Sequence, residues 1–123
     1  MLEIYQTLAR LALEEFPGVV TKVSFLGGTS ANPNKLRLTF IDGSFLDVWL
    51  SHEGDYSYHW EHRGQSGKYY RWDNAPHYPN VSSFPEHFHD GEEKMIKESH
   101  IGISPEDALR RVFGFISHKL RKL

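Results

Sequence analysis

The sequence predicts an α+β fold, in which an antiparallel sheet of about five strands carries the N- and C-terminal helices on one face. Two observations support this. Apolar residues recur at helical spacing in residues 2–16 and after Ser104, and the segments between them alternate with the period of strands. With 123 residues, the chain is long enough for one core and too short for two. We therefore expect a single domain spanning residues 1–123.

The first half of the chain contains the N-terminal helix, which Pro17-Gly18 ends, and three predicted strands. Val19–Leu26 is apolar and rich in β-branched residues, which favours a strand. Lys35–Phe40 alternates between polar and apolar residues, typical of a strand with one buried and one solvated face. Asp42-Gly43 indicates a hairpin because glycine readily adopts the positive φ of the turn. Phe45–Leu50 is then the returning strand.

The second half begins with an aromatic strand, Asp55–His62, which the turn Gly64–Gly67 connects to Lys68–Asp73. A long loop is predicted from Asn74 to about Ile103, and loops of this length are usually functional. Ser104-Pro105 then provides an N-cap and a first-turn proline for the last helix. The apolar stripe of this helix consists of Leu109, Val112, Phe113, Ile116 and Leu120.

Composition excludes several classes of protein. The formal charge of −2 does not indicate a general nucleic-acid binder, so any such surface must be a local patch. No cysteine is present, which excludes disulfides and thiolate zinc sites. No apolar run approaches the roughly 20 residues that span a bilayer, and no signal peptide is recognisable. We predict a cytoplasmic protein without a membrane partner.

Titratable and aromatic residues crowd into the segment between Phe45 and Asp90. It holds six of the eight histidines, all three tryptophans and five of the six tyrosines. The polar loop that follows Lys68–Asp73 is the densest part. Because loops held by a rigid scaffold often carry function, we expect the site here.

The predicted chemistry is RNA cleavage by internal attack of the 2′-hydroxyl, which needs proton carriers, a partner for the phosphate and no metal. Histidines can move protons, a carboxylate can orient them, and arginine can stabilise the phosphate. The candidate catalytic residues are Arg71, Asp73, His77, His87 and His89. The alternative is structural: Asp73 and Asn74 cap a turn, and Arg71 pairs with Asp73 or Glu61 across the sheet.

A second group of residues is predicted to bind substrate. Aromatic rings can stack on unpaired bases, and polar groups beside them can contact phosphate. The candidates are His59, Trp60, Trp72, Asn74 and Arg111. The alternatives are that the alternating aromatics pair across strands in the core, and that Arg111 belongs to a cationic helix end that complements the helix dipole.

The pair His87-x-His89 also has the spacing of many two-histidine metal sites, because both rings point to one side of an extended chain. His77, Asp73 or Asp90 would complete such a site. Without an evident third ligand, the spacing alone is weak evidence. We therefore predict no metal and no cofactor.

Three motifs resemble the signature of the TumE family: Tyr58-His59-Trp60, Arg71-Trp72-Asp73-Asn74-Ala75-Pro76-His77, and Phe84-Pro85 with the nearby histidines. The resemblance extends over roughly residues 35–120. It implies the toxin of a prokaryotic toxin–antitoxin pair, with a cognate antitoxin as partner. RNA is the second expected partner, and a dimer is compatible with this role. Two other functions remain open: a non-catalytic RNA- or protein-binding module, and a small hydrolase with a histidine-bound metal.

Overall fold

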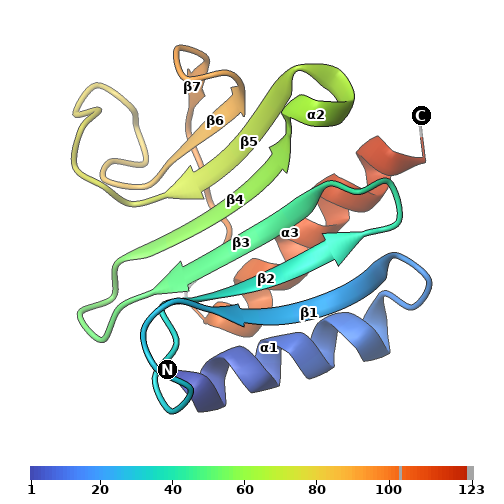
Figure 1. The fold of residues 1–123 in the computed structure, drawn as a ribbon. Coiled ribbons are helices and arrows are strands. Elements are labelled where there is room, and N and C mark those ends of the chain that lie inside the picture. Colours follow the sequence, from blue (N-terminus) through green and yellow to red (C-terminus); the bar gives the residue numbers. More distant parts are fainter. Residues whose placement is uncertain (103, 122–123) are drawn as a thin grey trace.

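The computed structural model describes residues 1–102 and 104–121 and confirms the α+β class. Helices α1 (Leu2–Glu15) and α3 (Pro105–Leu120) cover the same face of one antiparallel sheet (Figure 1). The sheet has seven strands in sequence order instead of about five. The strands are β1 (Val20–Leu26), β2 (Lys35–Phe40), β3 (Phe45–Leu50), β4 (Tyr56–His62), β5 (Lys68–Asp73), β6 (His87–Gly91) and β7 (Ile96–Lys97). A single helical turn, α2 (Arg63–Ser66), connects β4 to β5.

The two additional strands, β6 and β7, lie within the segment that was predicted as one long loop. That prediction was wrong there because β6 has a polar sequence in which Phe88 alone is a large apolar residue. Its strand geometry comes from antiparallel pairing with β5, which the local sequence does not reveal. The predicted end of the loop at Ile103 lies outside the described residues.

The register of this meander determines which side chains share a face, because side chains alternate along every strand. Residues that lie directly opposite each other on neighbouring strands share a face; Trp72 of β5 and Phe88 of β6, for example, both face the helices and are buried. The intervening pairs face away from the helices and include Arg71 with His89. The helix-free face, called the open face below, therefore collects polar side chains from β3 to β6.

The last helix is docked as the sequence predicts. Ser104 caps it by accepting a hydrogen bond from the Asp107 backbone N–H at 3.1 Å. The Phe113 ring is fully buried, with ring centroids 4.4 Å from Phe16 and 5.7 Å from Phe40. Phe113 thus joins both helices to the sheet.

We expect Phe113→Ala to lower the free energy of unfolding by about 3–5 kcal/mol, because it leaves a cavity between the helices and the sheet. His118→Ala, at an exposed position on the same helix, should change it by less than about 0.5 kcal/mol. Urea denaturation monitored by circular dichroism measures both values. Equal midpoints for Phe113→Ala and wild type would show that α3 does not contribute to the core.

Candidate functional site

A pocket of about 490 Å³ lies on the open face, between the ends of β4–β6 and the loop after β5. The sheet provides Arg71 and Asp73 from β5, and His87 and His89 from β6. The loop provides His77 and Tyr78, and the remaining lining residues are Trp49, Asp55, Tyr56, Ser57, Asn74, Ala75, Pro76 and Glu93. The predicted catalytic residues thus lie around one cavity.

Asp73, His87 and His89 form a compact cluster in the wall of this pocket. Asp73 and His87 are directly opposite each other in the β5–β6 pairing, and His89 follows two residues later on the same face. The Nε2 atoms of His87 and His89 lie 3.1 Å and 3.8 Å from the two carboxylate oxygens of Asp73. All three residues are buried, with exposed fractions of 8%, 1% and 1% for Asp73, His87 and His89. The cluster is therefore a direct product of the strand register.

Backbone carbonyl groups orient both imidazole rings. The Nδ1–H of His87 donates to the Pro85 carbonyl oxygen, and that of His89 donates to the Glu93 carbonyl oxygen, each at 3.0 Å. A carbonyl oxygen can only accept, so Nδ1 carries a proton in each ring and Nε2 is the nitrogen that faces the Asp73 carboxylate. Burial lowers the pKa of His89, which favours its neutral form.

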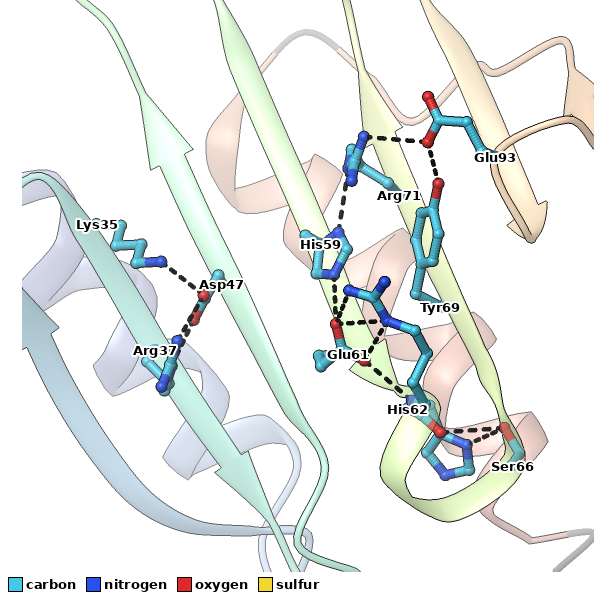
Figure 2. Close-up of polar contacts among 11 residues, drawn as sticks. Lys35, Arg37, Asp47, His59, Glu61, His62, Ser66, Tyr69, Arg71 and Glu93 are labelled. Carbon is cyan, nitrogen blue, oxygen red and sulfur yellow. Dashed lines mark hydrogen bonds and ion pairs between the residues drawn. The ribbon is translucent and has the colours of Figure 1, made fainter.

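Arg71 is held beside this cluster by its own hydrogen-bond chain (Figure 2). Its Nε–H donates to His59 Nδ1 at 3.1 Å, so the other ring nitrogen of His59 carries the proton and donates to Glu61 at 3.1 Å. Burial lowers the pKa of His59, consistent with this neutral ring. Hydrogen bonds from Arg63 hold the pKa of Glu61 at about 2. His59 therefore positions the Arg71 guanidinium.

The family comparison agrees with the motifs around this pocket. The family model described as Toxin TumE matches residues 9–120. The chain belongs to this toxin family. The match includes every strand and the whole pocket wall, and a TumE-family toxin implies an antitoxin partner. Comparisons with curated proteins and with solved structures gave no match.

Trp60 and Trp72, predicted to bind substrate, lie instead on the helix-covered face of the toxin. Their exposed fractions are 1% and 5%. The Trp72 ring stacks on Phe88 with centroids 4.6 Å apart, and the Trp60 indole N–H donates to Ser44 Oγ at 3.0 Å. Neither ring can stack on a base while the core is intact. The alternative interpretation of these aromatics as core pairs is the correct one.

Trp49, which the sequence interpretation overlooked, is the tryptophan that lines the pocket. Its side chain is 41% exposed, and it lies opposite Ser57 on the open face. The signal was present in the alternation of β3, where Leu46, Val48 and Leu50 point into the core. That alternation leaves Trp49 on the other side of the strand.

Asn74 and the turn that the Asp73 side chain caps have structural roles, as the alternative interpretation proposed. The Asn74 carboxamide accepts from the Tyr56 N–H at 2.9 Å and donates to the Gly54 carbonyl oxygen at 3.0 Å. Asp73 accepts from the Ala75 N–H at 2.9 Å. These bonds hold the β5 end and the β3–β4 hairpin together at the pocket rim. The Asp73 carboxylate also contacts His87 and His89.

His77 and Arg111 lie in different surroundings. His77 is exposed and lines the pocket from the loop after β5. Arg111 is exposed on α3, where it donates to the His100 carbonyl oxygen at 2.7 Å. It is absent from the pocket lining, so its predicted role in binding the same substrate lacks support from the geometry.

The open face beyond the pocket has paired charges. Lys35 and Arg37 both bind Asp47, with distances of 2.9 Å and 2.8 Å (Figure 2). Burial raises the pKa of Asp47, but the hydrogen bonds from these two cations outweigh it and hold the pKa below its usual range.

Among the described residues, no helix is long and apolar enough to cross a membrane.

Proposed function

We propose that this toxin acts in the cytoplasm by cleaving RNA in the open-face pocket. The observation that carries the proposal is the juxtaposition of Arg71 with the Asp73–His87–His89 cluster beside a cavity of about 490 Å³. A guanidinium beside titratable groups can bind a phosphate and stabilise the charge that develops on it during cleavage. Arg71 is 30% exposed at the side chain, so it can contact a ligand.

The proposed substrate is a single-stranded segment. The exposed Trp49 ring offers a stacking surface for one unpaired base at the pocket wall. The charge of −2 and the paired cations on the open face provide no broad surface for the backbone of a duplex. His77 is exposed and lines the pocket, which supports a role for it in exchanging a proton with the bound nucleotide.

The Asp73–His87–His89 cluster can serve this cleavage in two ways. In the metal-independent mode predicted from the sequence, a ring removes the 2′-hydroxyl proton and another group protonates the leaving oxygen. In the second mode, the three side chains hold a metal ion that activates water. The two modes leave different RNA ends: a 2′,3′-cyclic phosphate after internal attack, and a 3′-hydroxyl with a 5′-phosphate after attack by water.

The test is incubation of the purified toxin with a short labelled RNA, with and without a divalent metal. We expect specific cleavage, and mass spectrometry of the product ends identifies the mode. A substrate with a 2′-deoxy nucleotide at the cut site should resist internal attack and remain sensitive to attack by water. If the toxin binds this RNA without cutting it under any metal condition, the binding-module interpretation replaces the proposal.

We expect Trp49→Ala to weaken RNA binding by about 1–3 kcal/mol, because one stacked base loses its partner. Trp49→Phe should restore much of the affinity, and both variants should melt like wild type because the ring is solvent-exposed. Trp72→Ala is the matched control, since it should destabilise the fold by about 3–5 kcal/mol as a core residue. Fluorescence anisotropy and thermal melts measure the two effects, and unchanged affinity in Trp49→Ala would remove the stacking role.

A further inference from the structure

We propose that Asp73, His87 and His89 form a binding site for a divalent first-row transition-metal ion, such as Zn²⁺. No metal was predicted from the sequence because nothing in it showed which of His77, Asp73 and Asp90, if any, lies beside the His-x-His pair. The β5–β6 register supplies a third ligand by placing Asp73 directly opposite His87. One potential ligand atom from each residue then lies within 4.8 Å of the others.

The distances suit a small cation. Bonds of about 2.0–2.2 Å place neighbouring ligand atoms of a tetrahedral zinc-like ion roughly 3.3–3.6 Å apart. Asp73 Oδ1 lies 3.1 Å from His87 Nε2, and Asp73 Oδ2 lies 3.8 Å from His89 Nε2, so both contacts are close to this range. The histidine rings have centroids 4.9 Å apart and are inclined by 80°, so they approach the Asp73 carboxylate from different directions. The three ligand atoms lie within 4.8 Å of one another, so side-chain shifts of about 1 Å would bring them to these separations.

The hydrogen bonds of the rings provide a second argument. Both Nδ1–H groups donate to backbone carbonyl oxygens, those of Pro85 and Glu93. Nε2 is therefore the ring nitrogen left to bind a cation in each histidine, and both Nε2 atoms face the Asp73 carboxylate. A backbone carbonyl that fixes the outer nitrogen of the ring is the usual arrangement around metal-bound histidines.

The surroundings indicate a catalytic rather than a structural site. Three protein ligands leave at least one coordination position for water, as in hydrolytic zinc sites. All three ligands line the cavity, so this position is open to the substrate. The Tyr78 ring packs edge-on against both histidines, with centroids 4.7 Å from His87 and 5.6 Å from His89, and limits water around the ligands. Two imidazoles favour Zn²⁺ over Mg²⁺ and Ca²⁺.

The role of the ion in RNA cleavage rests on the proposed function, whereas binding of the ion does not. An ion at this site lowers the pKa of its bound water toward neutrality. The water oxygen forms a bond to phosphorus, the bond to the 3′ oxygen breaks, and the proton lost by the water is balanced by one taken up by the leaving oxygen. Arg71 then stabilises the phosphate, and His77, which lines the pocket outside the cluster, donates the proton to the leaving oxygen.

The test uses the full-length toxin without RNA. After dialysis against a chelator, the protein is titrated with Zn²⁺ alone, and binding is followed by calorimetry and by ¹⁵N NMR of the histidine rings. We expect one ion per chain and a zinc-dependent shift of the Nε2 resonances of two histidines, with their Nδ1 sites still protonated. Absence of saturable binding up to about 1 mM, or a shift of other ring nitrogens, would overturn the site.

Variants locate the ion. His87→Ala and Asp73→Asn should each weaken Zn²⁺ binding by at least about 100-fold, since even loss of an outer partner of a ligand costs about 10–100-fold. His52→Ala, at an exposed position in the β3–β4 turn, is the matched control and should bind like wild type. Equal affinity in all variants would place the ion elsewhere and refute the proposal.

If a variant fails to fold, the wild-type NMR result decides whether the site binds the ion. Metal binding without RNA cleavage would leave the site intact and refute only the proposed function.

Discussion

Asp73→Asn is expected to reduce RNA cleavage by about 10²–10⁴-fold while the toxin stays folded. Both modes of cleavage require the negative charge, either to orient and stabilise an imidazolium or to bind a cation. The asparagine side chain has nearly the same shape, and its carbonyl oxygen can still accept the hydrogen bond from the Ala75 N–H that Asp73 accepts at 2.9 Å. The turn at the end of β5 should therefore persist.

Single-turnover cleavage rates, with a circular dichroism melt of each variant, measure this effect. Asp90→Asn is the matched control: Asp90 lies on the neighbouring strand β6, pairs with Lys97 at 2.5 Å and is absent from the pocket lining. Its cleavage rate should match wild type. An Asp73→Asn rate within a factor of about three of wild type would remove Asp73 from the chemistry, because general acid–base groups contribute far more than this.

Arg71→Ala is expected to reduce the cleavage rate by about 10²–10³-fold, the usual cost of losing one group that stabilises the transition-state charge. Arg71→Lys should recover part of the rate, since an ammonium keeps the charge but cannot bind a phosphate with two parallel hydrogen bonds. The loss should appear in the rate at saturating RNA more than in affinity, because the charge develops during the reaction.

Arg110→Ala is the control for Arg71, because Arg110 is an exposed arginine that pairs with Glu15 outside the pocket lining and outside the hydrogen-bond chain of Arg71. It should leave cleavage unchanged. Growth arrest on expression gives an independent readout in cells. Full toxicity of Arg71→Ala would contradict the proposed role of the guanidinium, even if the variant melts at a lower temperature after losing its bond to His59.

The positions of the three tryptophans show how much of the site can be predicted from the sequence. Alternation in β3 places Trp49 outward, and alternation in β4 and β5 places Trp60 and Trp72 together on the opposite face. The pattern states which residues share a face, but not which face the helices cover in the aromatic strands. Burial resolved this, because the sheet face that packs on α3 receives the larger apolar rings.

Arg71 and His59 show a related limit. Both were predicted as site residues, one catalytic and one substrate-binding. The structure pairs them across β4 and β5, with the Arg71 Nε–H donating to the His59 ring. The ring of His59 is then bonded at both nitrogens, which makes it a support for Arg71. A sequence shows which side chains can donate or accept hydrogen bonds but not which groups they pair with. The pairing decides whether a side chain such as His59 is free to bind substrate.

The sequence by itself determined the two long helices α1 and α3, five of the strands and the stretch that carries the motifs of the toxin family, since periodicity, caps and turn residues act between near neighbours. Tertiary structure decided the rest. Strand β6 is polar and forms through pairing with β5, and this pairing brings Asp73 against His87 and His89. The cluster depends on register between segments 14 residues apart at Asp73 and His87, and a slip of one residue would turn both histidines to the opposite face. Local sequence does not encode that register, because it is set by the burial of Phe88 against Trp72 on the other side of the sheet.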